Sequence, residues 1–169
     1  MAFDGIALER QTASVKDHGD PQAVAQMLAH AASEDLVRAF SPNKDDAQLL
    51  DRVAFLRNWA PELEVPDLGP QPAEEARDPE AVTILTQWCW GKRGFHELRR
   101  QSLKNLLRGS LSHEQWSALQ SYAPSRIEVP TGSNIRLDYG DPDQPPVLAV
   151  RIQEMFGQTE TPTVARGRV

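Results

Sequence analysis

The chain has 169 residues, of which 40% are hydrophobic, so it is long and apolar enough to bury a core, and global disorder is excluded. Its 13 prolines and its mean hydropathy of −0.51 favour proline-interrupted helices joined by linkers over one tight core of the kind found in enzymes. The single cysteine excludes an intramolecular disulfide, and the formal net charge of −6 argues against a uniformly basic, nucleic-acid-binding surface.

The first predicted elements are a strand and two helices. A turn-forming Asp-Gly pair and a short alternating stretch in residues 3–8 predict the end of a β element that belongs to a preceding domain. Asp20 as a cap, Pro21 at the first helical position and apolar residues spaced by three and four predict a helix, which residues 36–40 extend. A serine-proline pair repeats this capping signature at the start of a second amphipathic helix over 41–61.

Residues 62–78 form a predicted acidic, proline-rich linker between two lobes. From Glu62 to Glu80 there are seven acidic residues and one arginine, so this stretch carries the whole net charge of the chain. Its prolines and scattered apolar residues leave no surface on which a core could form, and we expect it to be exposed. The linker divides the chain into an N-terminal lobe over 1–61 and a C-terminal lobe over 79–169.

Helices are predicted through the first half of the second lobe, over 79–123. The capping signature appears a third time at 78–79, and a glycine within 91–94 closes the helix that it starts. The leucines of 98–107 supply the next apolar face. A serine and a glutamine three residues apart at 112–115 match a capping box, which predicts a last helix in this region.

β structure is predicted after these helices. Residues 126–129 and 135–139 alternate with period two across a turn-like Pro-Thr-Gly-Ser-Asn sequence, which predicts a β-hairpin over 126–139. Residues 147–156 are ambiguous, because 147–150 suit a buried strand while the longer apolar spacing, with prolines before and a glycine after, favours a short helix. The predicted fold class is therefore α+β and mostly helical, with short helices in two lobes and a small β-hairpin near the C terminus.

Neither export nor a membrane span is predicted. The first ten residues lack a basic region followed by an apolar stretch, and the sequence contains no run of about 18 apolar residues. We therefore expect a soluble, cytoplasmic protein with no membrane partner.

The sequence lacks the usual motifs of nucleotide and zinc sites. It contains no Gly-x-x-x-x-Gly-Lys-Ser/Thr phosphate loop and no Gly-x-Gly-x-x-Gly after a strand, and its four histidines are scattered. A catalytic pair of Cys89 and His96 is disfavoured, because seven residues and a glycine-marked turn separate them and no third orienting group is evident. A buried, reduced Cys89 is the favoured alternative. We predict no catalytic, cofactor-binding or metal-binding residue in this chain.

Residues 92–108 are a locally basic stretch, with six basic residues against one acidic residue. Three of the basic residues are spaced by four and would form one cationic stripe along a helix, which can follow a phosphate backbone. The alternatives are a solvated helix face and a stripe that docks on the acidic linker. The candidate nucleic-acid contacts in this stretch are Lys92, Arg93, Arg100, Lys104 and Arg108.

Aromatic residues near the basic stretch also have two interpretations. Trp90, Phe95 and Trp116 are near enough in sequence to stack on bases, as proteins that bind single strands require. The apolar register of the tryptophans instead favours their burial in the core. The spacing alone leaves both interpretations open.

A block in the last third of the sequence resembles a known family. The segments that carry the resemblance are Ala123-Pro124, Val-Pro-Thr-Gly-Ser at 129–133, Ile-Arg-Leu-Asp-Tyr at 135–139, Pro-Val-Leu-Ala-Val-Arg-Ile-Gln-Glu-Met-Phe-Gly at 146–157, Thr161-Pro162 and Gly167-Arg168-Val169. In order and spacing they closely resemble the C-terminal region of bacterial HrpB helicases. Looser collinear agreement at 49–57 and 90–99 extends the resemblance over the whole chain.

The resemblance implies an accessory part of a DEAH-family, superfamily-two ATP-dependent RNA helicase. In that family two RecA-like lobes bind ATP and magnesium and move along RNA, while C-terminal helical and β elements complete the strand channel. The sequence has no counterpart of the motor, so we expect no enzyme activity and no cofactor in this chain alone. The family continues past Val169, and we therefore expect the C-terminal lobe to be truncated.

Two functions remain open on this evidence. The chain either helps to bind or guide single-stranded RNA, or it is a structural or protein-interaction module that packs on the motor lobes without touching nucleic acid. Arg136 and Arg151, in the block that carries the resemblance, are candidate contacts either to RNA phosphates or to carboxylates such as Asp138 and Glu154. The expected partners are single-stranded RNA and the motor lobes of the same protein.

Overall fold

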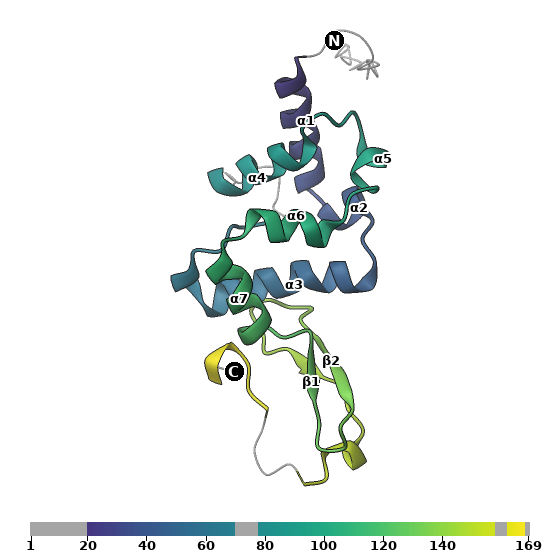
Figure 1. Cartoon of the computed structure of the whole chain (residues 1–169), viewed down its shortest axis with the longest axis vertical. Coiled ribbons are helices and arrows are strands. Elements are labelled where there is room, and N and C mark those ends of the chain that lie inside the picture. The colour runs from purple at the N-terminus through teal and green to yellow at the C-terminus, as the bar shows by residue number, and fades with distance from the viewer. Residues whose placement is uncertain (1–19, 70–77, 158–161, 168–169) are drawn as a thin grey trace, which may run out of the picture.

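The computed structural model describes residues 20–69, 78–157 and 162–167. Stacked helices form its larger part, and a small sheet extends from one end of the stack (Figure 1). The helices are α1 Pro21–Ser33, α2 Leu36–Phe40, α3 Lys44–Trp59, α4 Pro79–Cys89, α5 Phe95–Leu98, α6 Leu103–Ser110 and α7 His113–Tyr122, with short 3-10 helices η1 Pro61–Leu63, η2 Ile152–Met155 and η3 Ala165–Gly167. The strands are β1 Arg126–Glu128, β2 Asn134–Asp138 and β3 Val147–Leu148. The predicted class, α+β and mostly helical, is confirmed, whereas the strand predicted at 3–8 lies outside the described residues.

The predicted helix starts at 20–21, 78–79 and 112–115 are confirmed. The Asp20 and Asp78 side chains each accept a hydrogen bond from the backbone N–H two residues on, at 3.1 and 2.9 Å, and proline follows each cap. At the start of α7, Ser112 Oγ accepts from the Gln115 N–H while Gln115 Oε1 accepts from the Ser112 N–H. Each of these bonds joins residues close in sequence, so the local pattern suffices to predict it.

Two predicted boundaries in the first half of the chain were wrong. Residues 36–40 do not extend α1, because the Asp35 side chain caps a separate helix by accepting from the N–H three residues on at 2.8 Å. That helix, α2, ends at Ser41, whose φ of 48° lies in the left-handed region. The serine-proline pair therefore closes one helix and does not open the next. Asn43 caps α3 instead, accepting from the N–H groups two and three residues on.

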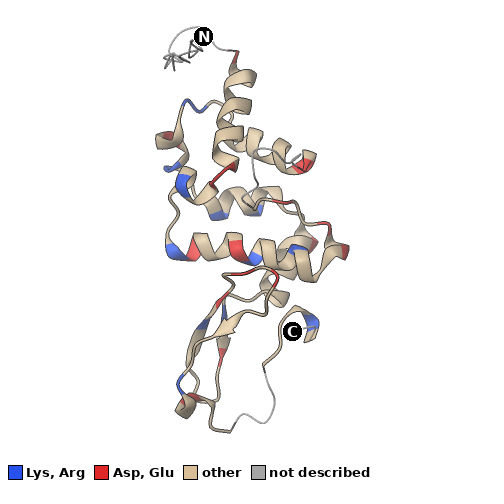
Figure 2. Ribbon diagram, turned by 180° about the vertical axis from the view of Figure 1, so that it is seen from behind, with Lys and Arg blue, Asp and Glu red and all other residues tan. Residues whose placement is uncertain are grey.

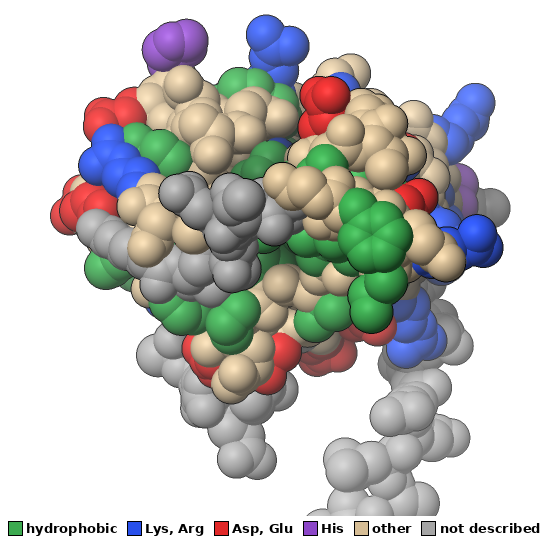
Figure 3. All heavy atoms as spheres, turned by 90° about the horizontal axis from the view of Figure 1, so that it is seen from below, with side chains coloured by type: hydrophobic (Ala, Val, Ile, Leu, Met, Phe, Trp, Pro, Cys, Tyr) green, Lys and Arg blue, Asp and Glu red, His purple; other side chains and the backbone are tan. Residues whose placement is uncertain are grey.

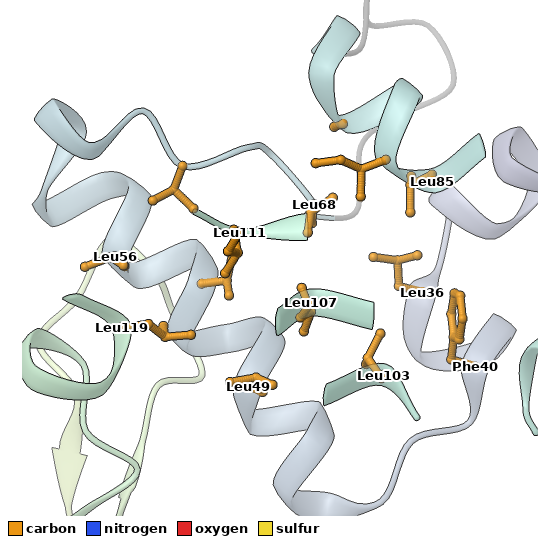
Figure 4. Close-up of a cluster of buried hydrophobic side chains, with 14 of the residues drawn as sticks. Leu36, Phe40, Leu49, Leu56, Leu68, Leu85, Leu103, Leu107, Leu111 and Leu119 are labelled. Atoms are coloured by element: carbon orange, nitrogen blue, oxygen red, sulfur yellow. The ribbon is translucent and has the colours of Figure 1, made fainter. Parts of the chain in front are cut away.

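One hydrophobic core connects the two predicted lobes (Figure 4). Leu36 and Leu49, from the first half of the chain, share this core with Leu85, Leu103 and Leu107, which follow the predicted linker. In the same way α1 packs along α4, and α3 packs against α6 and α7. Helix packing thus continues across the predicted boundary, so the core does not divide there.

The linker predicted over 62–78 is partly described, and its described part is exposed at Glu62 and Glu64 but not at its apolar residues. Three of its apolar side chains are buried: Val65, Pro66 and Leu68. The side-chain amide of Gln115, the residue of the α7 capping box, donates to the carbonyls of residues 63 and 64 at 3.1 Å each. Val65 and Leu68 therefore belong to the core and Leu63 packs against it, while 70–77 lie outside the described residues.

The predicted hairpin over 126–139 is confirmed. β1 and β2 pair antiparallel with Ile127 opposite Ile135. The turn between them closes with hydrogen bonds from the Gly132 N–H to the Val129 carbonyl at 2.8 Å and from the Val129 N–H to the Ser133 carbonyl at 3.0 Å. Gly132 has a φ of 83°, a conformation that glycine adopts without steric cost.

The helix predicted over 147–156 was wrong. Val147 and Leu148 form β3, which pairs antiparallel with the end of β2, and only 152–155 form a short 3-10 helix. A helix with the predicted spacing would bury Ile152 and Phe156 on one face, but these side chains are 78% and 70% exposed. No described element covers them, so a helix face at this position would have no partner. The backbone of residues 147–148 instead pairs with the edge of β2.

Helix α3 holds the hairpin against the helical part. Near its middle, the Gln48 side chain donates to the carbonyls of Ser125 and Leu137. Near its end, Asn58 Nδ2 donates to the Asp143 carboxylate at 2.8 Å, and the indole of the next residue donates to the carbonyl of residue 142 at 3.1 Å. The sheet, which is marginal alone at this size, is thereby anchored along most of one helix.

Candidate nucleic-acid interface

The turn between α4 and α5 presents a tryptophan and two of the predicted basic contacts. The N–H groups of Trp90 and Lys92 donate to carbonyls inside α4 at 3.2 and 3.0 Å, and Gly91 between them has a φ of 70°. The Arg93 N–H donates to the carboxylate of Glu97 in α5 at 3.2 Å. These bonds fix the backbone of the turn and leave the side chains of Trp90 and Arg93 exposed, while Lys92 is half-buried.

The predicted stripe of three cations on one helix was wrong for one member. α6 begins at Leu103, after a cap in which Ser102 Oγ accepts from the N–H three residues on at 3.3 Å. Arg100 therefore lies in the turn before the helix. Lys104 and Arg108 are on α6, four residues apart and exposed. Figure 2 shows basic positions along this stretch, separate from those on the hairpin.

Arg100 borders a hollow where α3 and α6 begin. The hollow, of about 350 Å³, is lined by both helix caps, Asn43 and Ser102, together with Arg99 and Arg100. Arg99 also donates to a backbone carbonyl of α2 at 3.2 Å. Asp46 lines the same hollow. The hollow therefore has both acidic and basic groups, and the acidic group opposes the binding of an anion.

Three of the predicted contacts differ in the interactions that they form within the protein: Arg108, Arg136 and Arg151. Arg136 forms an ion pair with Asp45 at 3.1 Å and donates to the Lys44 carbonyl at 2.6 Å, so it joins the hairpin to the start of α3. Its carboxylate partner is Asp45 and not Asp138, which sequence spacing had suggested. The guanidinium of Arg108 lies over the ring of Trp116, 5.9 Å from the centroid. Arg151 is exposed and has no ion pair among the described residues.

The aromatic residues in and near the basic stretch also differ in how deeply they are buried. Trp88 is buried, donates from its indole to Ser110 Oγ at 2.9 Å and meets the ring of Phe40 edge-on, which fits the core interpretation. Phe95 and Trp116 are partly buried against the core. Trp90 is 57% exposed, so burial was the wrong expectation for it. Among the described residues, none forms a hydrogen bond or a ring contact with its indole.

One acid of the predicted linker, Asp67, has a partner other than the basic stretch. Asp67 pairs with Arg57 of α3 at 3.1 Å. The neighbouring hollow, of about 430 Å³, is lined by three aspartates, Asp35, Asp51 and Asp67, and burial with the nearby Asp138 raises the pKa of Asp51 above its ordinary value. This acidic hollow is unsuited to a phosphate backbone.

Two buried polar residues of α3 were missed from the sequence. Gln48 and Arg52 are each 5% exposed. The Arg52 guanidinium donates to the carbonyls of Ala123 and Leu119 at the C-terminal end of α7, where a cation is favoured by the helix dipole, and burial lowers its pKa. Their spacing of four, with Phe55 three further on, was the available signal, because it places all three on one helix face.

The structure also shows the surroundings of the candidate nucleophile. Cys89 is fully buried, and burial raises the pKa of its thiol to about 11, so the thiol is protonated at neutral pH. The His96 side chain is 74% exposed and lies 3.6 Å from its neighbour Glu97. Within residues 20–69, 78–157 and 162–167, no group of three or more His, Cys, Asp or Glu side chains is placed to hold a metal ion.

Among the residues that the structure describes, none of the helices has both the length and the apolar content needed to cross a bilayer.

Three comparisons connect this chain to known proteins. The model of the ATP-dependent helicase C-terminal family matches residues 84–169. The ATP-dependent RNA helicase HrpB of Escherichia coli (strain K12) is 38% identical over 128 residues, which cover 72% of this chain and 14% of that protein.

Solved structures show the same similarity over more of the chain. The crystal structure of Escherichia coli DEAH/RHA helicase HrpB has a TM-score of 0.66 and 29% identity, and the match covers 92% of this chain and 19% of that one. The crystal structure of Escherichia coli DExH-box NTPase HrpB also gives 0.66 and 29%, over 90% of this chain and 18% of that one. This chain therefore spans less than a fifth of the proteins that it matches.

Proposed function

Because the chain belongs to the ATP-dependent helicase C-terminal family, we propose that it is an accessory region of an ATP-dependent RNA helicase that contacts single-stranded RNA. The observation that carries the RNA contact is a set of exposed cations between α4 and α6 that form no ion pair with a described residue. They are Arg93, Arg100 and Lys104. A guanidinium or ammonium group without a carboxylate partner can take an RNA phosphate without first breaking an ion pair.

In this proposal, the helicase reaction takes place outside this chain. ATP binding, magnesium binding and hydrolysis are assigned to RecA-like motor lobes of the larger cytoplasmic protein, and this chain supplies no catalytic or cofactor residue. Its partners are the motor lobes and the RNA strand that they move along. Arg136 is assigned a structural role, because its guanidinium already joins β2 to the start of α3.

Reversing two of the unpaired cations, Arg93→Glu with Lys104→Glu, is expected to weaken RNA binding at least 10-fold at about 50 mM salt. With about three phosphates neutralised, the salt dependence of single-strand binding has a slope near −2, so a fourfold rise in salt should weaken the unchanged protein about 20-fold. The measurement is fluorescence anisotropy of a labelled single-stranded RNA, titrated with protein at both salt concentrations.

The matched control is Arg57→Glu with Arg126→Glu, which changes the net charge by the same amount on α3 and β1. Both control residues are exposed. If the two double variants weaken binding equally, only the net charge matters and the proposed surface is wrong. An unchanged protein that does not bind RNA at low salt would refute the RNA contact altogether.

A second candidate function is favoured by apolar side chains at the hairpin end of the molecule. Val147, Ile152 and Phe156 are 61%, 78% and 70% exposed, and Figure 3, which views this end, shows apolar side chains at the surface. Large apolar side chains exposed at one end of a molecule are a feature of surfaces that contact other proteins. They suit a module that packs on the motor lobes of the helicase without touching nucleic acid.

Substituting Ile152→Ser with Phe156→Ser is expected to abolish co-elution of this chain with separately produced motor lobes at micromolar concentration. The physical reason is the loss of two large apolar contacts, each contributing about 2 kcal/mol when buried. Val37→Ser, at an exposed position on α2, is the control and should leave co-elution unchanged. Co-elution that survives the double substitution would rule out this surface as the contact.

A further inference from the structure

A groove with an uncharged, hydrogen-bonding lining lies between α1 and α4. It has a volume of about 580 Å³ and is lined by Gln22 and Gln26 from α1, by Val82, Thr86 and Gln87 from α4, and by Trp90, which follows α4. In Figure 1 these two helices lie side by side at the end of the molecule away from the sheet. The groove is therefore far from the exposed apolar residues at the hairpin end.

The lining offers both donors and acceptors of hydrogen bonds. The side-chain amides of Gln22, Gln26 and Gln87 have no hydrogen bond to another described residue. The Thr86 hydroxyl donates to the Val82 carbonyl at 2.8 Å, which leaves its oxygen free to accept. Amide groups present a donor and an acceptor in one plane, which matches the edge of a nucleobase and not a phosphate or a carboxylate.

Trp90 supplies a stacking surface at the same groove. It is 57% exposed, whereas Trp88, two residues earlier and inside α4, is 4% exposed. The backbone of Trp90 is held by its N–H bond into α4 and by the left-handed Gly91 that follows. Because the backbone is fixed and a tryptophan side chain has few torsions, binding of a base by Trp90 costs little conformational entropy.

Two cations of the turn between α4 and α5 are close to Trp90. Lys92 and Arg93 follow Trp90 by two and three residues, so the backbone keeps their Cα atoms within about 11 Å of it. A base that stacks on Trp90 would therefore have its flanking phosphates within reach of these two side chains. Among the described residues, those that line the groove are all uncharged, so the base contacts are separate from the phosphate contacts.

We propose that the α1–α4 groove binds one nucleobase of single-stranded RNA, stacked on Trp90 and hydrogen-bonded along its edge by the glutamine amides. This inference rests on the proposed RNA contact and deepens it. The exposed cations then bind the backbone without regard to sequence, and the groove adds an attraction for a base that the cations alone do not provide.

The test compares two labelled 12-nucleotide strands with the same phosphates, one of uridines and one of abasic sites. The unchanged chain is expected to bind the uridine strand about 10-fold more tightly, since stacking on one aromatic ring contributes about 1–3 kcal/mol per base. Trp90→Ala should bind both strands equally, with the affinity that the unchanged chain has for the abasic strand. Trp90→Phe should retain part of the preference, and Phe156→Ala, which removes an exposed aromatic residue elsewhere, should retain all of it.

Tryptophan fluorescence provides a second measurement that does not depend on the alanine variant. Quenching by the uridine strand should occur in the unchanged chain and be lost in Trp90→Phe even at saturation with RNA. Equal binding of both strands by the unchanged chain, or a preference that survives Trp90→Ala, would overturn the groove while leaving the basic surface in place. If neither strand binds at low salt, the proposed RNA contact fails together with the groove.

Discussion

Replacing Arg52 by methionine is expected to lower the free energy of unfolding by about 3 kcal/mol and the melting temperature by about 10 °C. The guanidinium is buried and donates to the carbonyls of Leu119 and Ala123 and, at 3.4 Å, to the side chain of Gln120. Methionine fills a similar volume but leaves the carbonyls at the end of α7 buried without a donor. Thermal unfolding followed by circular dichroism measures the change.

Two further variants make this expectation specific. Arg52→Lys keeps the charge but loses the planar fork that reaches several acceptors at once, so it should show an intermediate loss. Arg57→Met, on the same helix, removes a surface ion pair with Asp67 and should cost no more than about 1 kcal/mol. Equal losses for Arg52→Met and Arg57→Met would show that the buried contacts do not stabilise α7 as proposed.

Phe55→Ala is expected to lower the free energy of unfolding by about 4 kcal/mol, which lies in the range for deleting a buried ring. Phe55 is fully buried and its ring centroid lies 5.7 Å from that of Trp59 and 5.0 Å from that of Tyr139. Tyr139 follows β2 and donates from its hydroxyl to the Pro124 carbonyl at 2.7 Å. The cavity would therefore loosen the hairpin as well as α3, and amide exchange in β2 should accelerate.

The control for this variant is Phe156→Ala, which removes the same side chain from a site that is 70% exposed. It should change the free energy of unfolding by less than about 0.5 kcal/mol and leave amide exchange in β2 unchanged. Denaturant unfolding and hydrogen exchange together decide the outcome. A loss below about 1 kcal/mol for Phe55→Ala would mean that Phe55 does not join α3 to the hairpin.

The expectations that were correct concern interactions between residues close in sequence, whereas the incorrect ones depend on partners farther away in the chain. The caps at Asp20, Asp78 and Ser112 are hydrogen bonds across two or three residues, and the hairpin turn closes within five residues, so the sequence contains all their partners. The helix expected at 147–156 depends on a partner for its apolar face. Its actual partner is the edge of β2, which no local spacing reveals.

The candidate interface was predictable in composition but not in arrangement. The local excess of basic residues over 92–108 is visible in the sequence. Which of the predicted cations is engaged within the protein depends on the fold, because Arg136, outside that stretch, pairs with Asp45 and Arg108 lies over Trp116. The exposure of Trp90 likewise depends on the turn that follows α4 and on the glutamines of α1 beside it.

The sequence by itself determined the helix starts, the hairpin, the basic stretch and the resemblance to the helicase family, since each depends on residues that are near one another in the chain. The tertiary structure alone decided that helices on both sides of 62–78 share one core and that Gln48 and Arg52 are buried. It also decided which basic side chains remain unpaired. The physical reason is that burial and pairing depend on groups brought together across 60 or more residues. Arg52 and Ala123, for example, are 71 residues apart in sequence and joined by a hydrogen bond.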